Sequence, residues 1–255
     1  MFPIINILGK SYYSYHLFFI LSVIGTGCMF FLFEKNRTSI IDKIYLFSIC
    51  FISGIMGSKL FFFFEDIHMT FSQLVDLKNG FVFYGGFVGV VIALLIYFYR
   101  NIKSFYDSLD RLAISSAFGM FIGKIGCLLA GCCYGYPTRS VLGVYFNSIN
   151  SAAYNPTMPL FPIQVVDSLL NLLLFSLLLN FRKRLKLING YLFLIYILLY
   201  SIFRFVTEFY RADISRGFVF DWISLSQFYS IILIVLVIGY YSIKSFFYNR
   251  KLLNK

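Results

Sequence analysis

The chain is short of charge. Asp, Glu, Lys and Arg together make up 13% of its 255 residues, where soluble domains average about 25%. Hydrophobic residues make up 60%, and the mean hydropathy is +0.81. This balance excludes a soluble domain of ordinary composition and indicates a polytopic membrane protein.

Histidine and paired cysteine motifs are also scarce. The chain has two histidines and five cysteines, and no two cysteines stand in Cys-x-x-Cys spacing. Because zinc sites commonly use that spacing, the sequence argues against one, and we expect no metal or other cofactor. The net charge of +11 comes from short basic clusters between apolar runs and no nucleic-acid docking motif is present, so we expect no nucleic-acid partner.

What the chain has in abundance is long apolar runs. Seven of them reach the roughly 20 residues that a helix needs to cross a bilayer. We therefore predict an all-α, polytopic membrane protein with seven transmembrane helices and a single transmembrane domain over residues 1–255. Nothing typical of a cleavable signal peptide precedes the first run, so we expect that span to be retained. The predicted spans are 14–33, 44–64, 81–99, 112–133, 160–181, 190–210 and 222–243.

The distribution of Lys and Arg predicts the orientation. Fourteen of the 22 lie in the first, third and fifth loops and the C-terminal tail, five lie in the other connections and the N-terminal tail, and three lie inside spans. An excess of Lys and Arg marks the cytoplasmic side, so the N-terminus is predicted outside and the C-terminus in the cytoplasm. The longest connection, about 134–159, is then extracytoplasmic; its Pro, Asn and Ser residues suit either an ordered surface arm or a plain linker.

The stretch GMFIGKIGCLLAGCCYGYPT, residues 119–138, places Lys124 in an apolar run. An intramembrane charge is costly, so Lys124 is a candidate site residue; the alternative is that it snorkels to the surface. On a helix, Lys124, Cys127, Gly131 and Gly135 would share a face, and small residues four apart let helices approach closely. Cys132 and Cys133 could form a vicinal disulfide, carry a group as thiolate or fill space.

The sixth span, YSIFRFVTEFYR, carries a polar stripe. Tyr200, Arg204, Glu208 and Arg211 stand at i, i+4, i+8 and i+11 and lie on one helix face. Arg204 presents a planar fork suited to phosphate or carboxylate, although an ion pair that only fixes helix packing is the alternative.

The three intramembrane cations are Lys59, Lys124 and Arg204, against one intramembrane carboxylate, Glu208. This predicts a surplus of positive charge that an anion could satisfy. A phospholipid headgroup entering from the outer leaflet is the anion expected there. Further polar groups in the same layer are Tyr15, Tyr84 before the pair Gly85 and Gly86, and Gln164 and Asp167.

With these motifs in order, the chain resembles the prolipoprotein diacylglyceryl transferases of bacterial inner membranes. The resemblance covers most of the chain. It rests on Tyr15, on the Gly57-Ser58-Lys59-Leu60 motif and on four longer motifs: FYGGFVGV, GKIGCLLAGCCYGYPT, FPIQVVD and YSIFRFVTEFYR. Tyr200, Arg204, Glu208 and Arg211 fall on the family's Tyr, Arg, Glu and Arg.

Three positions depart from the family pattern. Tyr84 stands where typical members have His, Lys124 and Cys127 replace the Arg and Asn of a Gly-Arg-x-Gly-Asn signature, and Phe161 replaces the His of His-Pro-x-Gln. The chain thus resembles a divergent branch with GCCYG in the signature. Lysine still supplies a positive charge to a phosphate, but without bidentate geometry.

The resemblance implies a multi-pass transferase of the bacterial inner (plasma) membrane. It would move the diacylglyceryl group of phosphatidylglycerol to the lipobox cysteine thiol of prolipoproteins, recognised by their signal peptides, as the first step of lipoprotein biosynthesis. Two alternatives are a related phospholipid-dependent transferase with another thiol acceptor, and a non-catalytic lipid-binding or transport protein.

The resemblance also implies roles for particular residues. Lys124 and Arg204 would contact the phosphate, Glu208 would orient Arg204, and Tyr84 or Tyr15 would hydrogen-bond the headgroup or the thiol. The catalytic residues expected are Arg204, Glu208, Tyr84 and Tyr15. The substrate-binding residues expected are Lys124, Cys127, Gly85, Gly86, Gly135, Gln164, Tyr200 and Arg211.

Overall fold

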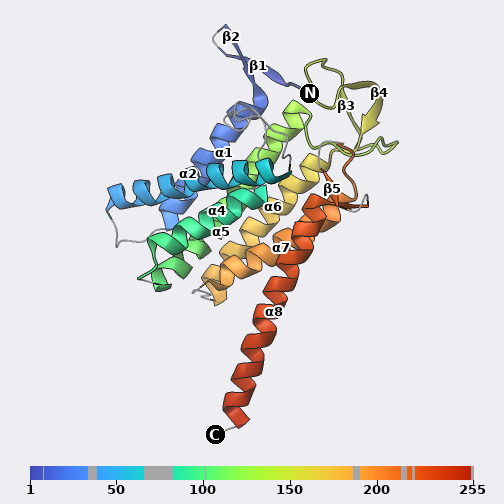
Figure 1. Ribbon diagram of the computed structural model, residues 1–255. Helices are drawn as coiled ribbons and strands as arrows, with labels where there is room; N and C mark the ends of the chain where they lie inside the picture. Colours follow the sequence, from blue (N-terminus) through green and yellow to red (C-terminus); the bar gives the residue numbers. More distant parts are fainter. Residues whose placement is uncertain are drawn as a thin grey trace. The chain divides into compact units, whose positions relative to one another are not determined.

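Seven α-helices lie in the part of the chain that the computed structural model describes, namely residues 1–7, 9–33, 39–65, 83–100, 102–185, 190–213, 217–219 and 222–253 (Figure 1). They are α1 (Ser14–Phe33), α2 (Ile40–Glu65), α4 (Phe83–Tyr97), α5 (Ile102–Ala130), α6 (Ile163–Asn180), α7 (Tyr191–Glu208) and α8 (Leu225–Leu253). Each corresponds to one predicted span. The prediction of an all-α, multi-pass membrane protein is confirmed.

Six of these helices are long and apolar enough to cross a membrane, and α4 is a shorter apolar helix. Its 15 residues measure about 22 Å at 1.5 Å of rise per residue. Part of the charge pattern behind the orientation lies outside the described residues: Lys35, Arg37, Lys78, Lys186, Arg216 and Lys255. The orientation stays a prediction.

The chain divides into two units. Unit one contains Met1–Met29, Ala113–Leu187 and Tyr191–Lys255, and unit two contains Phe30–Leu112 and Ile188–Gly190. Each is described by itself below. The single transmembrane domain predicted over residues 1–255 stays a prediction.

Unit two is organised by a close contact between α2 and α4. A Cβ atom on Gly57 would collide with the carbonyl oxygen of Gly85, and one on Gly85 would collide with the carbonyl oxygen of Gly57. Gly89 meets the carbonyl oxygen of Ser53 in the same way. The two backbones touch because glycines face each other across the interface, as small residues allow in membrane helices.

Unit one is a set of helices joined by packing and by side-chain hydrogen bonds. Ser22 of α1 donates to the carbonyl oxygen of Gly119 on α5 at 2.7 Å, and Ser168 of α6 donates to that of Phe121 on α5 at 3.0 Å. Helix α6 packs on α7, and α7 packs on α8 (Figure 1). Serine hydroxyls can join helices in this way because a backbone carbonyl accepts a second hydrogen bond.

The long connection after α5 is ordered. Strands β3 (Val144–Phe146) and β4 (Asn155–Leu160) pair antiparallel, with Val144 opposite Leu160. Buried Phe146, Ala153 and Leu160 form a small core beneath them. The segment is therefore an arm with its own structure and not a plain linker; its extracytoplasmic position stays a prediction.

Two further hairpins complete the described structure. Strands β1 (Ile4–Ile7) and β2 (Lys10–Tyr13) pair ahead of α1, and β5 (Phe218–Val219) and β6 (Ile223–Ser224) pair ahead of α8. A π-helical turn, Phe181–Leu185, extends α6.

Candidate active site

Helix α5 ends at Ala130, three residues earlier than predicted. Gly131 has a φ of +79°, in the left-handed region, and its N–H donates to the carbonyl oxygen of Cys127 at 2.9 Å. A left-handed glycine is a common way to end a helix. The prediction that Gly131 and Gly135 share a helix face with Lys124 and Cys127 is wrong, because both glycines lie beyond the helix end.

Short backbone bridges tie the chain after α5 to two other helices. The N–H of Gly135 donates to the carbonyl oxygen of Phe161 just before α6, and that of Tyr136 donates to Tyr210 just after α7, both at 3.2 Å. A Cβ atom on Gly135 would meet both of those carbonyl oxygens. These bridges hold the C-terminal ends of α5 and α7 and the N-terminal end of α6 together, so the polar residues at those ends converge.

Lys124 is paired inside the helix bundle. Its Nζ lies 2.6 Å from Oδ2 of Asp167 on α6, and the two side chains are 12% and 8% exposed. The simple alternative of a lysine that snorkels to the surface is therefore not what the structure shows. Sequence reasoning had noted Asp167 only as a further polar group, because a contact across 43 positions in the chain leaves no local signal.

Arg204 and Arg211 share Glu208. Nη2 of Arg204 lies 2.8 Å from Oε2 of Glu208 and donates to the Ser226 hydroxyl of α8 at 2.9 Å, and Nη1 of Arg211 lies 3.7 Å from the same carboxylate oxygen. Arg211 also makes a two-point contact with Asp213, with Nε donating to Oδ1 at 2.8 Å. Such a fork is the geometry in which Arg binds carboxylates most firmly.

The three cations of this cluster are paired. Lys124 faces Asp167, Arg204 faces Glu208, and Arg211 faces Asp213, so every one of these three cations has a carboxylate. The surplus of positive charge predicted from the sequence is thus wrong for this cluster, while Lys59 lies buried in unit two. An anion that binds here must compete with carboxylates already in place.

A narrow pocket opens between the pairs, with room for about one water-sized group. Its lining comes from α5, α6 and α7: Lys124, Asp167, Leu170, Asn171, Tyr200, Phe203 and Arg204. Within the described residues, Oδ1 of Asn171 and Nη1 of Arg204 are buried without a hydrogen-bond partner. Buried polar atoms are nearly always paired, so these two atoms mark where a polar ligand fits.

Three other predicted residues lie in unit one. Gln164 is fully buried and its Nε2 donates to the carbonyl oxygen of Cys132 at 2.8 Å, while Tyr200 is buried and stacks on Tyr196 with ring centroids 5.7 Å apart. Tyr15, the second residue of α1, is near enough to interact electrostatically with Lys124 and Cys127. The structure thus brings nine of the twelve predicted site residues into one unit.

The remaining three, Tyr84, Gly85 and Gly86, lie at the start of α4 in unit two. Tyr84 is buried, and the two glycines face α2. Their contact with α2 gives both glycines a packing role. Their role in binding substrate stays a prediction.

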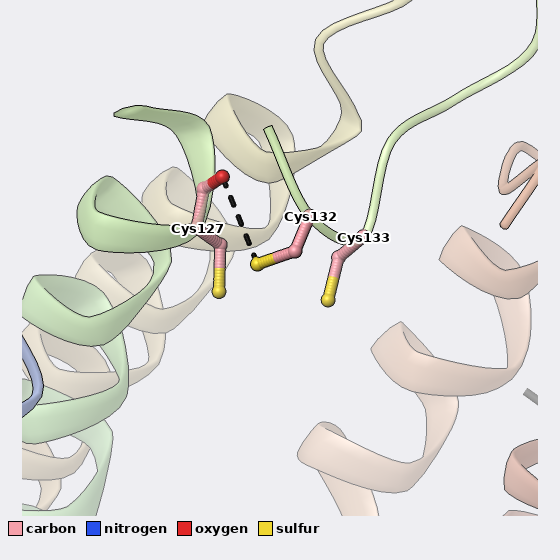
Figure 2. A group of neighbouring side chains, drawn as sticks. All are labelled: Cys127, Cys132 and Cys133. Carbon is pink, nitrogen blue, oxygen red and sulfur yellow. Dashed lines mark hydrogen bonds between the residues drawn. The ribbon is translucent and has the colours of Figure 1, made fainter. Parts of the chain in front are cut away.

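Three thiols gather where α5 ends (Figure 2). The sulfur atoms of Cys127, Cys132 and Cys133 all lie within 4.8 Å of one another. The Cys132 thiol donates to the carbonyl oxygen of Cys127 at 3.8 Å. All three cysteines are free. The neighbouring thiols of Cys127 and Cys132, helped by the charges of Lys124 and Arg211, hold the pKa of Cys133 well below its usual value.

Some residues of this cluster were not predicted from the sequence as site residues. Asp167, Asn171, Asp213 and Ser226 all contact a predicted residue or line the pocket. Only Asp213, two residues after Arg211, had a local signal that could have identified it.

The fold and this cluster define a class: a multi-pass membrane protein with a buried, charge-paired site between its helices. The family model for prolipoprotein diacylglyceryl transferases matches residues 3–243, and the chain belongs to that family.

Curated relatives agree. The chain is 34% identical over 246 residues to a phosphatidylglycerol–prolipoprotein diacylglyceryl transferase of Clostridium tetani, covering 94% of this chain and 96% of the relative. It is 33% identical to a second enzyme of that name from Clostridium perfringens, covering 90% of each chain. A relative of the same name from Pseudomonas putida is 29% identical over 85% of this chain and 80% of its own length.

Proposed function

We propose that this protein transfers the diacylglyceryl group of phosphatidylglycerol to the cysteine thiol of prolipoproteins. Membership of the transferase family and the names of its relatives support this activity. We further propose that the enzyme lies in the bacterial inner membrane and recognises the lipobox in the signal peptide of its acceptor.

The observation that carries the proposal is the pocket between Lys124 and Arg204. Two cations from different helices line it, and Nη1 of Arg204 is a buried donor that lacks a partner among the described residues. A phosphate diester supplies acceptor oxygens for cations of this kind. Because the pocket admits only about one water-sized group, phosphate binding requires these side chains to move.

The chemistry follows from these contacts. A thiolate attacks the glycerol carbon that carries the phosphate ester, a C–S bond forms, and the C–O bond breaks with its electron pair leaving on the phosphate. Negative charge thereby builds on the departing glycerol phosphate, and Lys124 and Arg204 stabilise it. Glu208 holds Arg204 at 2.8 Å and so orients its guanidinium.

Tyr84 or Tyr15 is proposed to hydrogen-bond the headgroup or the incoming thiol. A neutral tyrosine is a poor base at pH 7. Gln164 and Gly135 are proposed to shape the site, since their hydrogen bonds connect the helix ends that carry the charges, and Cys127, one turn after Lys124 on α5, is proposed to contact the substrate.

Mass spectrometry of a lipobox peptide tests the proposal. The purified protein, in membranes that contain phosphatidylglycerol, is expected to add one diacylglyceryl mass to the peptide cysteine. Lys124→Ala and Arg204→Ala are each expected to lower the rate by about 10²–10³, the usual cost of losing one group that stabilises transition-state charge. Lys244→Ala, at an exposed position on α8, is the matched control and should keep full activity.

Two outcomes would contradict the proposal. No mass increase by the folded protein, beside an active relative, would overturn the transferase function for these substrates. Full activity in both variants would show that Lys124 and Arg204 do not contribute to the reaction.

A further inference from the structure

Cys132 and Cys133 have no role in the chemistry above, and Cys127 takes no part in its bond-making steps. The three sulfurs of this thiol cluster lie within 4.8 Å of one another. Three thiolates on a tetrahedral zinc ion, each about 2.3 Å from the metal, lie about 3.8 Å apart. Small side-chain adjustments would therefore convert the cluster into a set of three metal ligands.

The backbone is bent to bring these thiols together. Gly131, with a φ of +79°, reverses the chain at the end of α5, and Cys133 follows with a φ of +56°. Among the described residues, Cys133 is the only one other than glycine with positive φ. Strained conformations of this kind persist where the surroundings enforce them and gather at functional sites.

The surroundings suit a negatively charged metal centre. Three thiolates on a divalent ion carry a net charge of −1, and Lys124 and Arg211 both act electrostatically on Cys133. Lys124 is three residues before Cys127, one turn along α5, so the thiol cluster adjoins the phosphate-binding cations. Gln164 anchors the loop by its hydrogen bond to the carbonyl oxygen of Cys132.

We propose that Cys127, Cys132 and Cys133 bind one thiophilic divalent metal ion of the zinc class, and that its fourth coordination position takes the acceptor thiol. The second part rests on the proposed function. Three protein ligands with one open position is the pattern of catalytic zinc sites, whereas structural sites are closed by a fourth ligand.

Binding at the fourth coordination position would deprotonate the acceptor thiol and so make it a nucleophile. A thiol that binds the metal releases its proton to water and remains as a metal-bound thiolate. That sulfur then forms the C–S bond while the C–O bond of the lipid breaks and the phosphate leaves with the electron pair. The thioether product is neutral and binds the metal more weakly, so it departs.

Cobalt(II) is the probe for the first part, because thiolate ligands give it an intense charge-transfer absorption. We expect the full chain, reduced and in detergent, to develop this absorption with saturation at one ion per chain, and zinc to abolish it. Cys127→Ser, Cys132→Ser and Cys133→Ser should each lose the band or shift it to the spectrum of fewer thiolates. Cys28→Ser and Cys50→Ser, outside the cluster, are the matched controls and should keep it.

The thermal unfolding temperature of each metal-free variant shows whether the variant is correctly folded. A variant that unfolds at the wild-type temperature and still lacks the band has lost a ligand. If every cluster variant misfolds, the cobalt titration of the wild-type protein tests the proposal by itself. The intensity of its thiolate absorption must then equal that of cobalt bound to three sulfurs. No thiolate absorption in the wild-type protein overturns the proposal, and so does a disulfide within the cluster that persists under the reducing conditions.

A lipobox peptide tests the open position. The peptide should change the cobalt spectrum, and the same peptide with serine in place of cysteine should not. If the cysteine and serine peptides give the same cobalt spectrum, the acceptor thiol does not bind the fourth coordination position. Metal binding and a thiol response without any diacylglyceryl transfer would instead overturn the proposed function, so the two failures are distinguishable.

Discussion

Helices α2 and α4 of unit two meet through glycines, whereas α5, α6, α7 and α8 of unit one are connected through buried polar side chains. In unit two the backbones touch at Gly57 and Gly85, and a single added carbon would push them apart. In unit one Lys124 of α5 pairs with Asp167 of α6, and Arg204, which pairs with Glu208 on α7 itself, donates to Ser226 of α8. The contact in unit two depends on close packing alone. The contacts in unit one also contain charged side chains that can change partner.

That difference matters for function. The glycine contact joins backbone to backbone, whereas an ion pair contains a charged side chain that a phosphate can also bind. The buried ion pair is weak evidence for stability in itself, because desolvation offsets most of the attraction. Its position at the pocket of unit one supports the proposed phosphate site.

Breaking the glycine contact should have the largest effect. Gly57→Val places a branched side chain against the carbonyl oxygen of Gly85, where even one methyl group collides with backbone. Overpacking costs about 1–3 kcal/mol where side chains can adjust, and more where backbone must move. We expect little folded protein on size-exclusion chromatography in detergent. Gly239→Val on α8, where a Cβ would meet nothing within 4 Å, should elute as the wild type. Normal elution of both would refute the close contact.

Removing the shared carboxylate of unit one should come next. Glu208→Gln leaves Arg204 without its 2.8 Å partner in a site where the Glu208 side chain is 1% exposed. Loss of one partner of a buried ion pair costs about 3–5 kcal/mol, which thermal unfolding in detergent measures. Asp42→Asn, at an exposed carboxylate that caps α2 through Ser39, should cost only about 1 kcal/mol. Equal losses in the two variants would mean that the Glu208 network contributes no more than a surface cap.

A lipid-dependent effect should be smaller and more specific. Asp167→Asn leaves Lys124 without its 2.6 Å partner, so a bound phosphate becomes its main counter-charge. Phosphatidylglycerol should then raise the unfolding temperature of the variant by at least about 2 °C more than that of the wild type, which is roughly 1 kcal/mol. Diacylglycerol, which lacks the phosphate, should show no such difference. An equal rise in unfolding temperature with both lipids would show that the phosphate does not bind at Lys124.

The smallest effect concerns the reactivity of one thiol. The folded-state pKa of Cys133 is lowered, so its thiolate persists as the pH falls below the ordinary cysteine pKa and is lost only when the folded pKa is reached. Between pH 8 and pH 6 the alkylation rate of an ordinary cysteine drops by up to about 100-fold, and that of Cys133 should drop much less. Peptide mass spectrometry after brief iodoacetamide treatment of the metal-free protein measures Cys133, with a cysteine-containing peptide in solution as the reference. A parallel decline of the two cysteines would contradict the lowered pKa.

Much of this protein follows from its sequence alone. Long apolar runs must be helices in a bilayer, since only a helix satisfies its own backbone there, and all seven runs are helical. The motif order identified the family, which the family model confirms. The i, i+4 spacing of Arg204 and Glu208 predicted their ion pair, because helix geometry places such residues side by side.

The tertiary structure decided the rest, because those features depend on contacts between distant segments. Asp167 neutralises Lys124 from another helix, and so the predicted surplus of cations is absent from the described cluster of unit one. One left-handed glycine, Gly131, ended α5 early and turned Cys132 and Cys133 back toward Cys127. Spacing along the chain showed no metal motif at these cysteines. Only the fold, by closing a turn of a few residues, placed three sulfurs within reach of one ion.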